Sequence, residues 1–134
     1  MKLQFKHQPF QAEAAAAVCD VFNGQPMRTT TYRLDLGAAD RPLSLAGTGT
    51  GLCNQPLAPE LTDARILKNL HTVQRRVGLP LSKALAGPGI NLSVEMETGT
   101  GKTYTYVKTI YELNARYGWS RFIIVVPSVA VREG

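Results

Sequence analysis

Met96-Glu97-Thr98-Gly99-Thr100-Gly101-Lys102-Thr103 is the most informative segment of this chain for its expected fold. Apolar residues alternate over 90–96 before it and predict a strand, and apolar spacing after it predicts a helix over 103–117. An unbroken apolar run at 122–126 predicts a second strand, of the kind buried on both faces of a parallel sheet. Strand, loop, helix and strand form one βαβ unit, so we expect an α/β fold with a right-handed crossover.

The loop also carries residues that cradle phosphates. The Walker A consensus is a glycine, any four residues, and then Gly-Lys-Ser/Thr. Gly101, Lys102 and Thr103 match its second half, whereas Met96 replaces the first glycine. Gly99 and Gly101 allow backbone N–H groups to face an anion, and the positive end of the following helix points to the same place. We expect Lys102 to reach the β- and γ-phosphates and Thr103 to bind Mg²⁺; the alternative is a flexible turn before a helix.

A family resemblance follows from this loop and its neighbours. The loop with methionine at its first position resembles motif I of superfamily 2 helicases and translocases. The longer run Met-Glu-Thr-Gly-Thr-Gly-Lys-Thr-Tyr-Thr-Tyr at 96–106 is similar to the Res subunit of type III restriction–modification enzymes. Further matching segments are Lys108-Thr109-Ile110, Leu113-Asn114 and Phe122-Ile123-Ile124-Val125-Val126-Pro127-Ser128. The resemblance implies a P-loop RecA-like fold, the first helicase lobe, with an incomplete parallel sheet and helices on both faces.

The resemblance also assigns site residues. Phe10-Gln11-Ala12-Glu13-Ala14 resembles the glutamine motif that precedes the first strand, and implies that Gln11 contacts adenine. Its amide offers the donor and acceptor that adenine's N6 and N7 require, although an exposed helix glutamine is the alternative. Pro127-Ser128 corresponds to motif Ia, which implies DNA contact by Ser128 and Arg132. The predicted cofactor-binding residues are Gln11, Thr98, Gly99, Thr100, Gly101, Lys102, Thr103 and Tyr104, with Lys102 and Thr103 as catalytic residues and Thr103 as the metal ligand.

The function implied is that of an ATP-dependent type III site-specific deoxyribonuclease. With ATP and Mg²⁺ it would move on double-stranded DNA and cleave it, beside a methyltransferase (Mod) subunit and without a membrane, in the cytoplasm. The alternatives are another superfamily 2 helicase or ATPase, a small P-loop kinase, or an inactive truncated remnant. No Asp-Glu box follows the run 122–126. We therefore expect the N-terminal part of a larger protein, or a remnant, with the other helicase and nuclease domains absent and negligible hydrolysis by this part alone.

The rest of the chain divides into two parts before residue 90. Residues 1–24 predict a helix with the stripe Phe10, Ala14, Val18, Val21 and Phe22, begun near Pro9 and ended by Gly24. Residues 25–89 predict an irregular region with a short strand at 30–36, a surface loop at 46–51, and a helix over 60–77. Thr62 or Asp63 caps that helix, and Gly78 and Pro80 end it. Its basic residues predict a solvated face, with DNA or subunit contact as the alternative.

Composition sets the outer limits. The chain has 134 residues, 44% of them hydrophobic, and a net charge of +5, which suits one domain or part of one. No apolar run approaches the roughly 20 residues of a membrane span. Cys19 and Cys53 fit neither a disulfide framework nor a zinc site, and His7 and His71 stand alone. Trp119 is expected to pack rather than to stack on bases.

Overall fold

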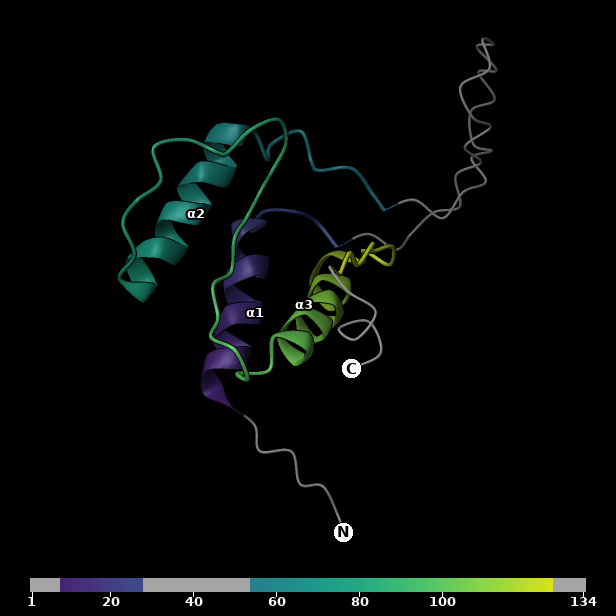
Figure 1. Ribbon diagram of the computed structural model, residues 1–134. Helices are drawn as coiled ribbons and strands as arrows, with labels where there is room; N and C mark the ends of the chain where they lie inside the picture. The colour runs from purple at the N-terminus through teal and green to yellow at the C-terminus, as the bar shows by residue number, and fades with distance from the viewer. Residues whose placement is uncertain (1–7, 28–53, 127–134) are drawn as a thin grey trace.

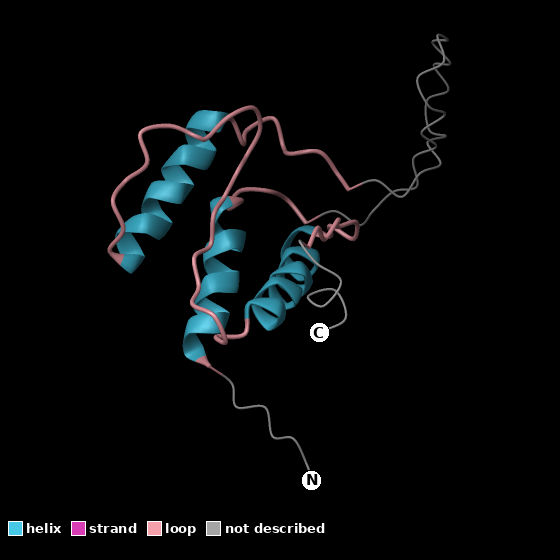
Figure 2. Ribbon diagram, in the orientation of Figure 1, coloured by secondary structure: helices cyan, strands magenta, loops and turns pink. Residues whose placement is uncertain are grey.

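The computed structural model describes residues 8–27 and 54–126, which contain three helices. These are α1 (Pro9–Val21), α2 (Asp63–Val77) and α3 (Lys102–Tyr117). Helix α1 lies between the other two and contacts both, as Figure 1 shows. An irregular segment, residues 78–101, joins α2 to α3 and passes along α1 (Figure 2). The short strand predicted at 30–36 and the loop at 46–51 lie outside the described residues.

The α/β fold class predicted from the sequence is wrong for the described residues, which form helices and no strand. Residues 90–96 and 122–126 are irregular, and no backbone hydrogen bond between described residues joins them. Ile123 is 92% exposed and Val125 86%, so the run expected to be buried on both faces is largely in solvent. β-branched residues suit a pleated surface, but a strand exists only where a neighbouring strand takes up its backbone groups. The described residues therefore do not form the RecA-like lobe with a parallel sheet.

Most of the predicted helix ends are confirmed by their capping residues. Pro9 opens α1, but this helix ends at Val21 with Phe22 as its C-cap, before the Gly24 that was expected to end it. Thr62 caps α2, its hydroxyl accepting from the Arg65 N–H at 3.4 Å, and Gly78 ends that helix in the left-handed conformation with φ 72°. Gly118 ends α3 in the same way, with φ 74°. The Thr62 hydroxyl and the left-handed glycines give hydrogen-bond partners to backbone groups that the helix leaves unpaired, and proline lacks one such N–H. These capping residues therefore act locally, without tertiary contacts.

The predicted apolar faces were less accurate than the helix ends. On α1 the fully buried residues are Ala15, Cys19 and Val21, whereas Phe10 at the head of the predicted stripe is 43% exposed. On α3 the helical spacing of Val107, Ile110, Tyr111 and Asn114 predicts one buried face. The structure instead buries Thr105, Leu113 and Tyr117, and leaves Tyr111 71% exposed. The face of α3 that becomes buried depends on which residues of α1 pack against it. The apolar periodicity of α3 alone does not identify that face.

The C-terminal end of α1 holds the three helices together. The residues that make these contacts include Cys19, Asp20, Leu113, Tyr117 and Trp119. Cys19, Leu113, Tyr117 and Trp119 form a buried cluster against which Phe22 packs. The Tyr117 hydroxyl donates to the Cys19 carbonyl at 2.7 Å. Trp119 is therefore a packing residue, as predicted.

Asp20 joins all three helices by charge. Its two carboxylate oxygens accept from Arg76 of α2 and Arg116 of α3, each at 2.7 Å. Burial alone would raise the pKa of Asp20, but the hydrogen bonds and charges of the two guanidinium groups outweigh it and lower the pKa. The same contact raises the pKa of Arg116. Burial raises the pKa of the neighbouring Cys19 thiol to about 11.

A buried amide fixes α2 against α1. The Asn69 Nδ2 atom donates to the carbonyls of Val21 and Asn23, both at 2.9 Å, and so satisfies two carbonyls at the end of α1. Ile66 and Val73 lie on the same side of α2 and pack with Val21 and Leu61 in a second buried cluster. Within the part of the chain that the structure describes, none of the helices has the length and apolar character needed to span a membrane.

Candidate phosphate-binding site

The loop before α3 has the backbone conformation of an anion-binding turn. Gly99 and Gly101 have φ values of 80° and 86°, in the region that favours glycine. Gly101 is the N-cap of α3, and no side chain caps this helix. The N–H groups of Lys102 and Thr103, the first two residues of α3, have no acceptor within the helix. These two N–H groups and the positive end of the helix dipole are thus available to a negatively charged ligand.

Short hydrogen bonds keep this loop in one shape. The Thr100 hydroxyl donates to the Glu97 carbonyl at 2.6 Å, which closes the turn. The Gly101 carbonyl accepts from the Thr105 N–H at 3.0 Å and from the Thr105 hydroxyl at 3.2 Å, which ties the loop to the first turn of α3. Sequence reasoning did not identify Thr105. Its position four residues after Gly101 was the available signal, because threonine in a helix commonly bonds the carbonyl four residues earlier.

Gln11 of α1 also holds the loop. Its Nε2 atom donates to the Thr100 carbonyl at 2.8 Å, across 89 residues of sequence. A Cβ atom added at Gly101 would overlap this amide, so the glycine also permits the close approach of α1. The bond uses one N–H of the amide, and within the described residues the second N–H and the oxygen make no further hydrogen bond. The structure therefore brings Gln11 to the loop through a contact to the backbone that the sequence did not suggest, and adenine contact stays a prediction.

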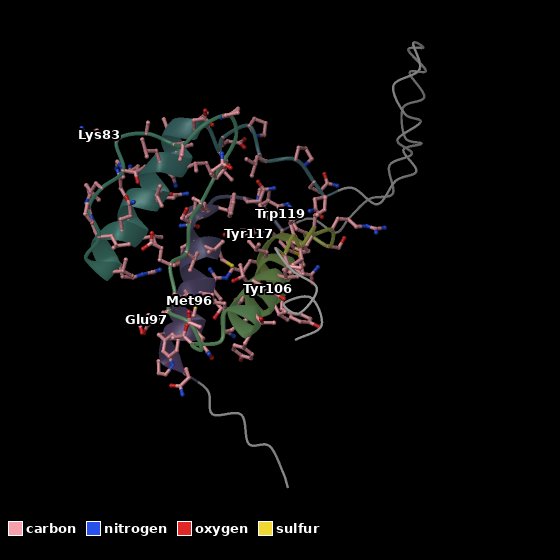
Figure 3. The ribbon with its side chains drawn as sticks, in the orientation of Figure 1. Lys83, Met96, Glu97, Tyr106, Tyr117 and Trp119 are labelled. Carbon is pink, nitrogen blue, oxygen red and sulfur yellow. The ribbon has the colours of Figure 1, made fainter. Side chains whose placement is uncertain are left out.

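The predicted site side chains lie together on the surface. Lys102 and Thr103 are exposed at the start of α3, and Tyr104 is 41% exposed beside them. Thr98 and Gly99 are exposed in the turn, while Thr100 and Gly101 are half-buried against α1. Figure 3 shows Met96 and Glu97 at the opposite end of the helices from Tyr117 and Trp119. The predicted DNA-contact residues Ser128 and Arg132 lie outside the described residues.

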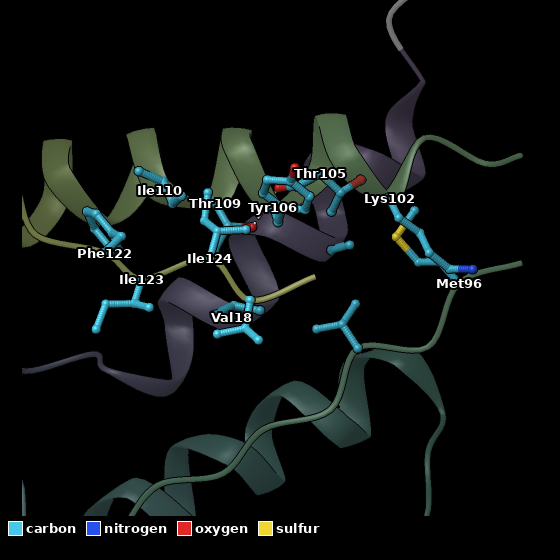
Figure 4. Close-up of a pocket in the computed structure, with 13 residues that line it drawn as sticks. Val18, Met96, Lys102, Thr105, Tyr106, Thr109, Ile110, Phe122, Ile123 and Ile124 are labelled. Carbon is cyan, nitrogen blue, oxygen red and sulfur yellow. Dashed lines mark hydrogen bonds between the residues drawn. The ribbon is translucent and has the colours of Figure 1, made fainter. Parts of the chain in front are cut away.

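An open cavity of about 490 Å³ begins beside the loop and is lined by α1, α3 and the segments 94–96 and 122–125. Figure 4 shows Lys102 and Met96 at one end of it and Phe122 and Ile123 toward the other. Lys102 is the only charged residue in the lining, and the remainder is mainly apolar. Phosphates require N–H groups and cations, so the loop suits a phosphate better than the body of this cavity does.

The described residues offer little to a metal ion on their own. They contain no group of three or more His, Cys, Asp or Glu side chains placed to hold one. His71, the one histidine among them, bonds the Ser82 carbonyl through Nε2 at 2.7 Å. Any Mg²⁺ at the loop would therefore depend largely on phosphate oxygens and water, beside the Thr103 hydroxyl.

Comparison with known proteins gives one family and several relatives. The family described as "Type III restriction enzyme, res subunit" matches residues 63–134. The Res subunit of the type III restriction-modification enzyme EcoP15I from Escherichia coli is 42% identical over 76 residues, 56% of this chain. The EcoPI Res subunit from Escherichia phage P1 is 44% identical over 75 residues, 55% of this chain. The StyLTI Res subunit from Salmonella typhimurium is 49% identical over 55 residues, 41% of this chain.

These relatives are much longer than the chain. The aligned segments make up 8% of the first two subunits and 6% of the third. The family match includes α2, the loop and α3, and leaves α1 with Gln11 outside it. The similarity therefore includes the candidate phosphate loop but only a small part of any whole subunit.

Proposed function

We propose that this chain, which belongs to the family of type III restriction enzyme Res subunits, binds ATP through the loop of residues 96–103. Family membership confirms the resemblance drawn from the sequence, and it removes the alternative of a small P-loop kinase. The observation that carries the proposal is the turn with positive φ at Gly99 and Gly101, placed at the uncapped start of α3. Such a turn directs backbone N–H groups at phosphate oxygens.

Each site side chain has a role in this proposal. Lys102, exposed on the first turn of α3, neutralises the β- and γ-phosphates. Gln11 contacts adenine with the N–H and the oxygen that its bond to Thr100 leaves available. Thr98, Gly99, Thr100 and Gly101 supply the turn, and Tyr104 lies beside it.

The described residues fit ATP binding better than ATP hydrolysis. Thr103 offers Mg²⁺ a single hydroxyl ligand, whereas Mg²⁺ in proteins normally has one or two carboxylates in addition to phosphate oxygens. Bound Mg²⁺ would neutralise phosphate charge and help to orient the nucleotide. We therefore expect the chain by itself to bind ATP and to hydrolyse it negligibly.

We also propose an activity for the whole protein. A complete subunit of this family would use ATP hydrolysis to move on double-stranded DNA and cleave it, together with a methyltransferase (Mod) subunit. The supporting observation is that the relatives bear the name of restriction-modification Res subunits. Ser128 and Arg132 would contact the phosphodiester backbone, which carries no sequence information and so suits movement along any DNA. We place the protein in the cytoplasm, where a free thiol such as Cys19 stays reduced.

Titration with a fluorescent ATP analogue tests the phosphate site. Lys102→Ala should weaken binding by about tenfold or more, because a charge-assisted contact to phosphate is worth about 1.5–3 kcal/mol. Lys108→Ala is the matched control, since it removes the same charge from α3 at a residue that pairs with Glu112 at 3.5 Å. Gly101→Val should be more severe than Lys102→Ala because its side chain displaces Gln11. Unchanged binding in Lys102→Ala, with the fold intact, would show that the loop is not the phosphate site.

A further inference from the structure

The longest stretch of the chain without an acidic residue includes most of α2. From Ala64 to Val94 there is no Asp or Glu, and there are five basic residues, so this stretch carries a charge equal to the +5 of the whole chain. The five are Arg65, Lys68, Arg75, Arg76 and Lys83. A field of one sign over this part of the surface attracts an anion with several charges.

Four of these residues, three on α2 and one in the segment that follows it, make up what we call the α2 basic face: Arg65, Lys68, Arg75 and Lys83. On the helix, Lys68 is three residues after Arg65 and seven before Arg75, spacings that place side chains on the same side. Ile66 and Val73 occupy the buried side of α2, and all four basic residues are exposed.

The charges of the α2 basic face are not neutralised within the described residues. The ion pairs there involve Arg76, Lys108 and Arg116, and none involves the four residues of this face. Arg76 differs because Asp20 occupies its guanidinium group at 2.7 Å. The fifth basic residue of the stretch therefore holds the helices together, whereas the other four are available to a partner.

The face is also held rigidly. Asn69 bonds α2 to the end of α1, and three hydrogen bonds fix Ser82 beside the helix. The Ser82 N–H and hydroxyl bond the Gln74 amide at 3.0 and 2.8 Å, and its carbonyl bonds His71 at 2.7 Å. Lys83 follows directly and lies at the outer edge of the molecule (Figure 3). Its backbone is thus fixed in advance, which lowers the entropy lost on binding.

We propose that the α2 basic face binds the phosphodiester backbone of DNA without sequence preference. The choice of DNA as the partner rests on the proposed function, whereas the charge and geometry of the α2 basic face do not depend on it. Arg65 and Arg75 are ten residues apart, about 15 Å along the helix axis, which corresponds to about four nucleotides of one DNA strand. No Phe, Tyr or Trp occurs from 64 to 94, and the half-buried ring of His71 bonds the Ser82 carbonyl. The face therefore has no platform for base stacking, and contacts to phosphates are what its side chains can make.

The test measures binding of a labelled 20-base-pair duplex of mixed sequence against salt concentration, by fluorescence anisotropy. With four phosphates neutralised, affinity should fall roughly 150-fold between about 50 and 200 mM salt, because the expected slope is about −0.9 per phosphate. The variant combines Arg65→Gln, Lys68→Gln, Arg75→Gln and Lys83→Gln. It should lose at least about tenfold in affinity at the lower salt concentration and most of the salt dependence.

A control of equal charge separates this face from net charge. Lys2→Gln, Lys6→Gln, Arg28→Gln and Arg33→Gln remove the same charge from positions outside the described residues, and this variant should bind like the parent. An equal loss in both variants, or no loss in the first, would overturn the proposal. Binding of a poly-glutamate peptide as tightly as the duplex would overturn the assignment to DNA. Lys102→Ala should bind the duplex normally, so failure of the ATP site and failure of this face are distinguishable.

A second measurement uses the unaltered chain and does not depend on how a variant folds. Acetylation of lysines by a water-soluble reagent, read by mass spectrometry, should slow at Lys68 and Lys83 when the duplex is present. Lys108, which is paired with Glu112 on α3, should react at an unchanged rate. Equal reaction at Lys68 with and without the duplex would rule out the α2 basic face as the contact.

Discussion

The two ends of α1 have opposite surroundings. At its C-terminal end Cys19 is fully buried, Asp20 pairs with both neighbouring helices, and Phe22 packs on Tyr117 and Trp119. At its N-terminal end Phe10 is 43% exposed, and Gln11 makes one hydrogen bond to the loop beside an open cavity. The closed end has the contacts that stabilise a fold, while the open end leaves polar groups and apolar surface available. Stability and the proposed ligand site are therefore separated along a single helix.

Trp119→Ala should give the largest effect, because it removes the largest side chain of the closed end. The indole is 9% exposed, lies 5.1 Å from the Phe22 ring and 5.4 Å from the Tyr117 ring, and donates to the Gln55 carbonyl at 3.2 Å. Truncating a buried aromatic residue costs about 3–5 kcal/mol, so urea denaturation should show an unfolding free energy lower by about 3 kcal/mol.

The matched substitution lies at the open end. Phe10, at the N-terminal end of α1, is 43% exposed, so Phe10→Ala should change the free energy of unfolding by about 1 kcal/mol or less. Similar losses for the two variants would contradict the contrast between the ends of α1.

Asp20→Asn should have an intermediate effect that depends on pH. The carboxylate is 30% exposed, so the two ion pairs together are expected to contribute about 1–2 kcal/mol after screening by solvent. Folding lowers the pKa of Asp20. Its contribution to stability is therefore present above the unfolded pKa of about 3.9 and is lost as the pH falls through the lower pKa of the folded state. Thermal melting should show the parent exceeding the variant at neutral pH and approaching it in acid. A difference that stays constant from pH 7 to about pH 2 would argue against Asp20 as its source.

The sequence predicted those features of the fold that depend on neighbouring residues. Pro9, Thr62, Gly78 and Gly118 mark helix ends through local backbone bonds, and these ends are confirmed. The strand predicted at 122–126 was wrong, because a strand needs a partner that an apolar run cannot specify.

Contacts between residues that are distant in the sequence could not be predicted from local sequence patterns. Asp20 meets Arg76 and Arg116 across 56 and 96 residues, and nothing near Asp20 in the sequence indicates either partner. At the candidate site, the turn glycines and Lys102 were recognisable from their pattern. Gln11 was singled out only for adenine, and its bond to Thr100 depends on how α1 packs against the loop.

Gln11→Ala should give the smallest of these effects, and it distinguishes two roles of one amide. Loss of the bond to Thr100 should weaken binding of inorganic tripolyphosphate by roughly twofold to tenfold, since a hydrogen bond is worth about 0.5–1.5 kcal/mol. Gln8→Ala is the control, because the Gln8 side chain does not cap α1 and lies three residues earlier. Isothermal titration with tripolyphosphate, ATP and GTP gives the comparison. A loss confined to ATP would mean that Gln11 contacts the base and does not position the loop.

The position of Cys19 gives the molecule a built-in reporter of its own opening. The thiol is completely buried where the three helices meet, and its raised pKa keeps it protonated at neutral pH. A thiol-specific reagent can therefore react with it only while α1 and α3 are transiently apart. In a Cys53→Ser background, the alkylation rate relative to that of an unstructured thiol gives the equilibrium constant for this opening. Its dependence on ATP would then measure, at the closed end of α1, how strongly ligand binding at the open end restrains the whole helix.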